Sequence, residues 1–142
     1  MTKYKREDIL VYVAGPYTKG PNGEPPVINT RTALQYAEIV SEAGFTPFIP
    51  HLFHFWEFLS PKPYQFWMDL DEKMLARSDV MLRLPGESSG ADQEEEFCEK
   101  TEIPHFAVLF EDMERERLPE AFVRAFDEGL IEPRNGVQVH PR

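Results

Sequence analysis

The sequence predicts an α/β fold: a single doubly wound, mostly parallel sheet of the flavodoxin or Rossmann-like kind, with helices on both faces. Three observations support this prediction. Short apolar runs rich in β-forming residues recur along the chain. Segments with the apolar spacing of amphipathic helices separate these runs. Strands joined by helices form right-handed crossovers, which makes the sheet parallel and covers both of its faces.

The first half of the chain alternates strand, loop, helix and strand. Gly15 and Pro16 end the first apolar run, and the glycine- and proline-rich residues that follow favour a loop. A helix is favoured where Ala33 and Ala37 recur at helical spacing, and Gly44 suits its end. The expected elements are a strand over residues 9–14, a loop over 18–27, a helix over 30–43 and a strand over 45–49.

The second half begins with an aromatic, irregular segment that is closed by Pro61 and Pro63. After it, helical spacing and short apolar runs alternate again. The expected elements are helices over residues 64–77, 91–101 and 117–128, strands over 80–84 and 103–110, and a tail or edge strand over 129–142. A chain of 142 residues can form one domain with its own core, so we expect a single domain.

Composition limits what the protein binds. The net charge of −10 and the pI near 4.8 argue against nucleic acids and anionic membranes, and favour a small ligand that is neutral or singly charged. Cys98 is the single cysteine, so no internal disulfide can form, which favours a cytoplasmic location. The N-terminal residues lack the apolar core of a signal peptide, and no run approaches the ~18 apolar residues of a membrane span.

The most informative stretch is residues 86–94, with the sequence GESSGADQE, which follows the third apolar run and opens a helix. Such a strand-to-helix turn offers free backbone N–H groups and the positive end of a helix dipole. Ligands of open parallel sheets bind at the carboxyl ends of the strands. The segments after residues 14, 49 and 84 all begin at that edge, so we expect them to form one site.

Three consecutive glutamates follow this turn, and helical geometry separates them. At ~100° per residue, Glu94 shares a face with Ala91 and Cys98, Glu96 points away, and Glu95 is intermediate. We therefore expect Glu94 to face inward from the first turn of its helix. The alternative is that all three glutamates form a solvated acidic face, which suits a helix N-terminus.

A second carboxylate, Asp71, lies on an apolar helix face with Trp67 and Met74. A carboxylate in that position needs a partner or a function. The alternative is a boundary residue that caps the helix or pairs with a neighbour. Asp69 lies beside charged residues, and we expect it to be more exposed.

Tyr12, near the carboxyl end of the first strand, is either a core residue or a hydroxyl that reaches a carboxylate across the strand ends. His51 and His54 lack the ligand spacing of a metal site. With Phe53, Trp56 and Trp67 they form either a pocket wall that stacks on a flat base or a satellite core.

Several nucleotide and hydrolase motifs are missing. The sequence has no G-x-G-x-x-G and no Walker A loop. Ser88 matches the G-x-S-x-G pattern only formally, because a serine hydrolase also needs a downstream acid and histidine. The only later histidines are His105, at the start of a strand, and His140, in the tail, so we disfavour this interpretation.

The remaining motifs form an ordered set over residues ~9–110: Val11-Tyr12-Val13-Ala14-Gly15-Pro16-Tyr17, Pro50-His51, Asp71, Ser78-Asp79-Val80 and Ser88-x-Gly90-Ala91-x-x-Glu94. In this order and spacing, the chain resembles the nucleoside 2-deoxyribosyltransferase family and the related nucleoside 5′-monophosphate N-glycosidases. The resemblance implies a doubly wound α/β fold and cleavage of the N-glycosidic bond of a nucleoside or nucleotide.

The resemblance also implies residue roles. Glu94 would be the nucleophile, Tyr12 would orient it, and Asp71 would act as general acid toward the base or hold it. The sugar would pass to another base or to water, without a metal or other cofactor. The implied substrate-binding residues are Gly15, Pro16, Tyr17, His51, Trp67, Ser88, Gly90 and Ala91. Relatives complete their sites across subunits, which implies a homo-oligomer.

The chain departs from the family in the loop over residues 18–27, where phosphate-binding members often have Ser and Arg, and in its heavily aromatic residues 51–67. Lys19, Ser88 and Ser89 could supply donors to a phosphate. Two other functions are compatible with the sequence. One is a non-catalytic nucleotide-binding or regulatory module, and the other is an acidic scaffold whose aromatic segment binds a protein.

Overall fold

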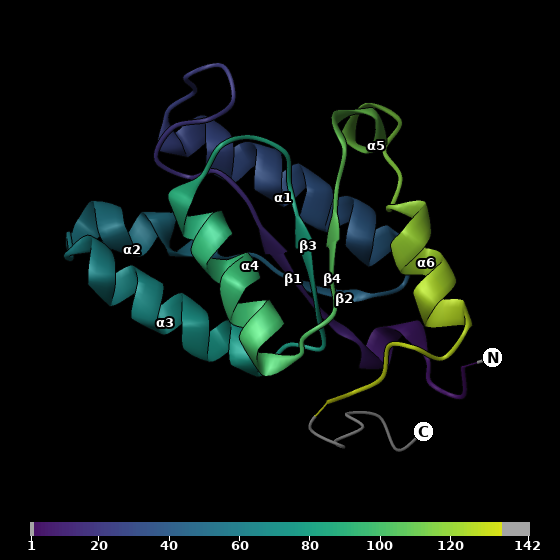
Figure 1. Cartoon of the computed structure of the whole chain (residues 1–142). Helices are drawn as coiled ribbons and strands as arrows, with labels where there is room; N and C mark the ends of the chain where they lie inside the picture. The colour runs from purple at the N-terminus through teal and green to yellow at the C-terminus, as the bar shows by residue number, and fades with distance from the viewer. Residues whose placement is uncertain (1, 135–142) are drawn as a thin grey trace.

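Four parallel strands form one sheet in the order β2-β1-β3-β4 (Figure 1). The computed structural model describes residues 2–134. The strands are β1 (Leu10–Ala14), β2 (Thr46–Phe48), β3 (Val80–Arg83) and β4 (His105–Ala107). Pro47 lies within β2, which is an edge strand, where a missing backbone N–H is tolerated. The predicted class, a single α/β Rossmann-like sheet with helices around it, is confirmed.

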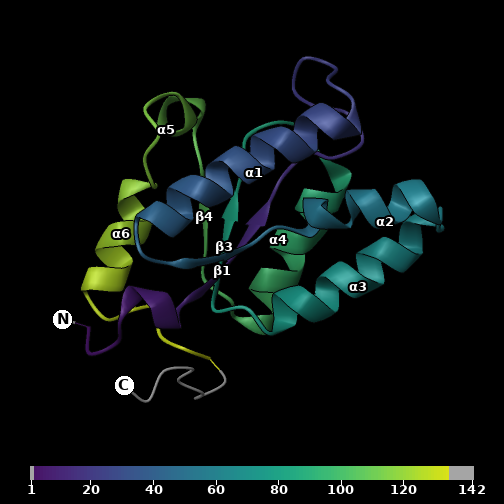
Figure 2. The ribbon, with the colours of Figure 1, turned by 180° about the vertical axis from the view of Figure 1, so that it is seen from behind.

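Alternating side chains of β1 supply the two halves of the core. Val11 and Val13 pack in the cluster that includes residues of α1 (Pro26–Glu42) and α6 (Glu120–Asp127). Tyr12 and Ala14 point to the other face and pack in the cluster that includes residues of α3 (Tyr64–Ala76) and α4 (Ser89–Thr101). Figure 2 shows α1 crossing in front of the strands, with α6 beside it.

Several helix boundaries differ from those predicted. Helix α1 begins at Pro26, four residues early, because a proline fits the first helical position. Helix α4 begins at Ser89, since the Ser88 side chain caps it by accepting a bond from the Ala91 amide at 3.1 Å. Glu94 is therefore in the second turn and not, as predicted, in the first. Helix α6 begins at Glu120, three residues later than predicted.

Two segments that were expected to lack helix contain one. The aromatic segment folds into a 3₁₀ helix (Pro50–Phe53) and α2 (His54–Leu59). The last predicted strand is shorter than expected, because Phe110–Glu114 forms α5, where the Asp112 carboxylate accepts a bond from the Leu109 amide at 3.0 Å. A further 3₁₀ turn spans Arg6–Asp8. The expected edge strand with Val137 and Val139 lies outside the described residues.

The chain order reverses between β1 and β3. From β1 the chain passes to β2 on one side, and then crosses to β3 on the other side. The loops that leave the carboxyl ends of β1 and β3 therefore diverge, which in open parallel sheets creates a ligand crevice. None of the helices within residues 2–134 has both the length and the hydropathy that a bilayer crossing requires.

Candidate functional site

A cavity of about 490 Å³ opens at this point of reversal. Its wall is formed by the loop after β1, the 3₁₀ turn and α2, one face of α3, and the start of α4. The predicted site residues in this wall are Gly15, Tyr17, His51, Trp67, Asp71, Ser88, Gly90, Ala91 and Glu94. Pro16 is not part of the wall, because it is buried behind it. Tyr12 lies fully buried beside Glu94.

Glu94 faces inward, as the helical spacing predicts. It is 7% exposed and shares its face of α4 with buried Ala91 and Cys98. The Tyr12 hydroxyl donates a hydrogen bond to its Oε2 atom. Glu96 is exposed and pairs with Lys100 at 3.0 Å. The alternative interpretation, in which the glutamates form a solvated acidic face, is therefore correct for Glu96 and wrong for Glu94.

Burial dominates the electrostatics of this pair. Desolvation raises the pKa of Glu94 to about 8, while the hydrogen bond from Tyr12 acts in the opposite direction. Desolvation also raises the pKa of Tyr12 well above its usual value, and the nearby Glu94 carboxylate adds to this effect. Tyr12 is therefore a neutral, permanent donor whose hydroxyl stabilises the ionised form of Glu94.

Asp71 is the second carboxyl group of the cavity. Its Oδ1 atom is buried and accepts no hydrogen bond from the part of the chain that the structure describes. Desolvation raises its pKa to about 7. Asp69 is exposed, as predicted, and accepts a bond from Gln65 at 2.8 Å. An unpaired buried oxygen in a cavity wall is a position for a polar group of a ligand.

His51 presents a second unpaired atom. Its Nε2 lies 3.0 Å from the Pro16 carbonyl oxygen. Because a carbonyl only accepts, Nε2 carries the proton, and burial lowers the pKa of the ring, so the imidazole is neutral. Nδ1 is then an acceptor without a partner among residues 2–134. Nearby, the Tyr17 hydroxyl and Nδ1 of His54 are 2.6 Å apart.

An aromatic group forms the far wall of the cavity. The Trp67 ring stacks on Phe53 at 5.8 Å and 24°, and meets the edges of Trp56 and Phe66. Its indole N–H donates to Glu57 Oε1 at 2.9 Å. Sequence reasoning gave Glu57 no role, because it treated this segment as irregular. Its helix has six residues and is followed closely by Pro61 and Pro63, so periodicity gave no signal that could have revealed it.

Two glycines let the cavity walls approach each other. A Cβ atom at Gly90 would lie 3.3 Å from the Tyr64 hydroxyl, so α4 packs close to α3. A Cβ atom at Gly15 would lie 2.9 Å from Leu84 Cβ, which real contacts almost never show. The end of β1 therefore requires glycine.

Arg83, which sequence reasoning missed, holds the start of α4 in place. Its guanidinium donates to Asp92 at 2.5 Å, to Glu95 at 3.2 Å and to the Gly86 carbonyl at 3.0 Å. These bonds fix the turn over residues 86–88 relative to β3. They also bring a positive charge toward Glu94, which lowers its pKa slightly against the effect of burial.

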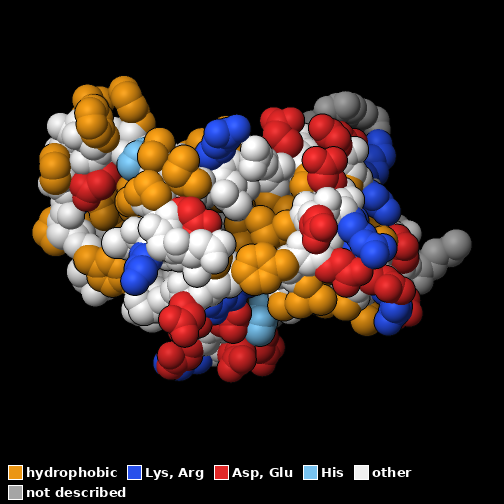
Figure 3. Space-filling model, turned by 90° about the horizontal axis from the view of Figure 1, so that it is seen from above, with side chains coloured by type: hydrophobic (Ala, Val, Ile, Leu, Met, Phe, Trp, Pro, Cys, Tyr) orange, Lys and Arg blue, Asp and Glu red, His pale blue; other side chains and the backbone are white. Residues whose placement is uncertain are grey.

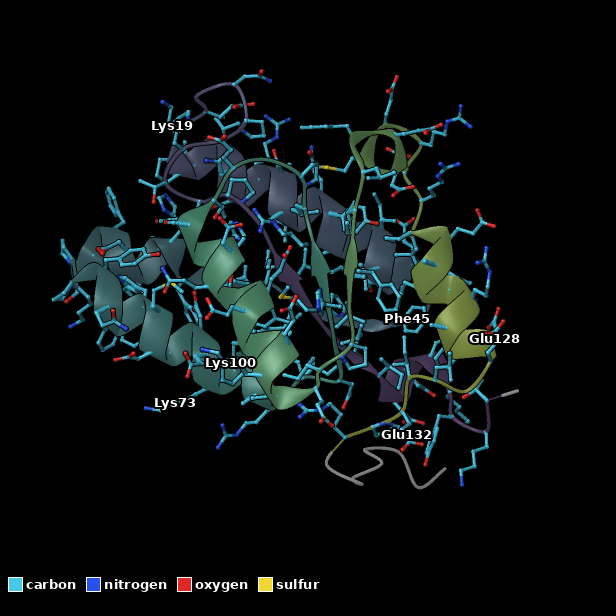
Figure 4. All side chains as sticks on the ribbon, viewed as in Figure 1. Lys19, Phe45, Lys73, Lys100, Glu128 and Glu132 are labelled. Atoms are coloured by element: carbon cyan, nitrogen blue, oxygen red, sulfur yellow. The ribbon has the colours of Figure 1, made fainter. Side chains whose placement is uncertain are left out.

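Lysine side chains reach the cavity from two sides. Lys19 and Lys62 line it, and Figure 4 shows Lys19 on the loop after β1, well above Lys73 and Lys100 in that view. Neither cavity lysine forms an ion pair within the described residues. In the same range, no group of three or more His, Cys, Asp or Glu residues is arranged to hold a metal ion.

Together these features define an α/β protein with a polar and aromatic cavity at the reversal point of a parallel sheet. Among solved structures, the chain is similar to BlsM, determined in solution, with a TM-score of 0.56 and 20% sequence identity over 88% of this chain and 78% of that one. At this identity the similarity shows a shared fold alone. No protein-family profile matches the chain, and no curated protein sequence matches it.

Proposed function

We propose that the protein cleaves the N-glycosidic bond of a nucleoside or nucleotide, with Glu94 as the nucleophile. The main support is one arrangement: a buried Glu94 that accepts a hydrogen bond from Tyr12, in the same cavity as Asp71 with its unpaired buried oxygen. The two carboxyl groups lie in distinct environments, since Glu94 accepts a hydrogen bond from Tyr12 and the buried oxygen of Asp71 accepts none from the described residues. A two-step glycosidic reaction uses two carboxyl groups in different roles.

In the first step, a Glu94 oxygen forms a bond to C1′ of the sugar while the bond from C1′ to the base nitrogen breaks. The bonding electrons leave with the base, and Asp71 transfers a proton to it. In the second step, water or a second base attacks C1′ and gives up a proton to the Asp71 carboxylate, while the bond from C1′ to Glu94 breaks and Glu94 departs as a carboxylate. Water makes the enzyme a hydrolase, and a second base makes it a transferase. Two displacements retain the configuration at C1′.

The mechanism requires one proton on the two carboxyl groups. With pKa values of about 7 for Asp71 and about 8 for Glu94, the pair holds close to one proton near neutral pH. The Tyr12 bond stabilises negative charge on Glu94, whereas Asp71 Oδ1 has no such donor. Because the pKa of Glu94 lies above that of Asp71 even with the Tyr12 bond, most of the one-proton form carries its proton on Glu94. The reactive form is the minor one, in which the proton is on Asp71 and the Tyr12 bond stabilises the Glu94 carboxylate.

The proposal extends to the setting of the enzyme. The substrate is a small nucleoside or nucleotide, and Lys19 and Ser89 in the cavity wall would face an anionic substituent.

We place the enzyme in the cytoplasm and propose that it self-associates. Large exposed apolar side chains gather where α2 lies (Figure 3), namely Leu52, Phe55, Trp56, Phe58 and Leu59. Sedimentation equilibrium of the wild type and Phe58→Glu tests this association.

The decisive experiment incubates the protein with a panel of nucleosides, 2′-deoxynucleosides and their 5′-monophosphates, with and without a free acceptor base, and separates the products. Release of free base, or appearance of a new nucleoside, supports the proposal. Binding of the panel without base release would instead support a non-catalytic nucleotide-binding module. The variant Glu94→Gln, measured in parallel, excludes a contaminating activity.

A further inference from the structure

Glu57 is a carboxylate in the aromatic wall of the cavity that the proposed mechanism does not use. It lies on α2 and is held by Trp67 and Lys62, which line the same cavity. Its Oε1 atom accepts bonds from the Trp67 indole N–H at 2.9 Å and from the Lys62 amide at 3.1 Å. Among residues 2–134, the Lys62 amide alone donates to its Oε2 atom, at 3.2 Å. These bonds fix the carboxylate in one orientation.

The two donors leave part of the carboxylate unused. An ionised carboxyl group has about four acceptor positions, and Oε2 takes only a share of one N–H here. Glu57 nevertheless belongs to the lining of the cavity. The free acceptor capacity of Oε2 is therefore available to a ligand with N–H donors, whereas a carbonyl oxygen of a ligand would be repelled.

Glu57 lies where the base of the substrate would bind, and not where the sugar would bind. Trp67 and Asp71 are four residues apart on α3, so their side chains lie on one face of that helix. The indole N–H of Trp67 meets Glu57. The wall therefore carries a carboxyl group at each end of an aromatic surface, which suits a flat base that is protonated at one edge and recognised at another.

We propose that Glu57 selects the leaving base, favouring bases that present adjacent N–H donors to a carboxylate. This inference rests on the proposed function. Guanine fits best, because its ring N–H and its 2-amino group point in the same direction and can both donate to Oε2, the oxygen with unused acceptor positions. Hypoxanthine keeps the ring N–H and lacks the amino group, and thymine presents a carbonyl oxygen where guanine-like bases present donors.

Binding tests this inference separately from catalysis. The ligands are 2′-deoxyguanosine and 2′-deoxyinosine with their 5′-monophosphates, which differ only in the 2-amino group, and affinity is measured by calorimetry with Glu94→Gln so that no turnover occurs. We expect at least ~10-fold tighter binding of the guanine member of each pair, from a hydrogen bond to a charged acceptor. Adding Glu57→Gln should reduce this preference to less than ~3-fold.

The Glu57→Gln variant distinguishes a role of Glu57 in recognising the base from a structural role in the cavity wall. Its amide oxygen still accepts the Trp67 N–H bond, so the wall is kept, but its NH₂ group opposes the donors of guanine. A purely structural role of Glu57 predicts an unchanged preference. Exposed Glu72, on the outer side of α3, provides the control variant Glu72→Gln, which should keep the full preference.

Each outcome is informative. Equal affinity for guanine and hypoxanthine ligands, no detectable binding of either, or a preference that survives Glu57→Gln would each overturn the inference. A preference that depends on Glu57 in a protein that releases no base supports the inference and contradicts the proposed function. Base release by a protein that binds guanine and hypoxanthine ligands equally well supports the proposed function and contradicts the inference.

Discussion

The hydroxyl group of Tyr12 in β1 donates a hydrogen bond to Glu94 in α4, which lies 82 positions further along the chain. Both side chains are buried, so the bond links the sheet to the helix at the base of the cavity. A buried tyrosine could stabilise a core without any polar partner. Its bond to a carboxylate that lines a cavity is what makes this pair a candidate for chemistry, and the predictions below depend on it.

Replacement of Glu94 tests the nucleophile. We expect Glu94→Gln to lower the rate of base release by at least ~10³-fold, because the amide cannot form the glycosyl ester. The matched control is Glu96→Gln, which removes an exposed carboxylate two residues away and should keep the rate within a factor of two. Similar rates for the two variants in a product assay would refute the assignment.

The pH dependence of the rate tests the protonation state. The carboxyl pair loses its two protons near pH 7 and pH 8, and the active form holds one. We expect kcat/KM to be highest between these values. It falls at lower pH as the pair takes up a second proton, and at higher pH as the pair loses its last proton. A rate that is flat from pH 5.5 to 9 would contradict this scheme.

Tyr12→Phe changes that profile in a defined direction. The Tyr12 bond lowers the pKa of Glu94, so its loss raises this pKa further. Because Glu94 has the higher pKa of the pair, the alkaline limb of the profile moves to higher pH, and the maximal rate falls as less of the pair has Glu94 ionised. It also leaves a buried carboxylate without its donor, at a cost of ~1–3 kcal/mol in the free energy of unfolding. Rate measurements across pH give the position of this limb, and urea denaturation gives the free energy of unfolding. An unmoved alkaline limb would show that the bond does not act on catalysis.

Asp71→Asn should slow base departure while leaving the fold intact. Its effect depends on the leaving group, since a group that departs without protonation has no need of the acid. We expect a ~10²–10⁴-fold loss with natural nucleosides, and little loss with a 4-nitrophenyl deoxyriboside. An equal loss with both kinds of substrate would assign Asp71 to structure or to sugar binding.

Stability should fall as pH rises. Folding raises the pKa of Glu94 from 4.5 to about 8 and that of Asp71 from 3.8 to about 7, so the native state holds more protons than the unfolded chain between about pH 4 and pH 8. The free energy of unfolding then decreases across this window, by at most ~1.4 kcal/mol per pH unit for each proton that the native state alone retains.

The variant that carries both Asp71→Asn and Glu94→Gln has no proton to lose at these positions. Urea denaturation at pH 5 and pH 8.5 should therefore give a smaller difference for this double variant than for the wild type. Glu96→Gln, with its exposed side chain, should behave like the wild type. A double variant that loses as much stability as the wild type would show that other groups control the pH dependence.

Periodicity was sufficient to predict the sheet and the inward face of α4. Apolar runs mark all four strands, and the three-to-four-residue spacing separates Glu94 from Glu96, because in a helix only one of them can share a side with Ala91. The pairing of Glu94 with Tyr12 was not predictable from periodicity. It depends on which strand lies under α4, which is a property of the tertiary fold.

The aromatic segment shows where local patterns fail. Helix α2 has six residues and is followed by two prolines within four positions, so its helical period was too short to detect. Glu57 lies on this helix, so its role was not predicted either. Arg83 was missed for a related reason: it lies at the end of a buried strand, and only the fold brings it to the carboxylates of α4.

A covalent intermediate on Glu94 would test the central claim most directly. The protein is incubated with 2′-deoxy-2′-fluoro analogues of the nucleosides and 5′-monophosphates of the panel, quenched in acid, digested and analysed by mass spectrometry. The account predicts a glycosyl adduct on the peptide that contains Glu94, and none in Glu94→Gln. Free base released by the wild type with no adduct, or with an adduct on another residue, would contradict it.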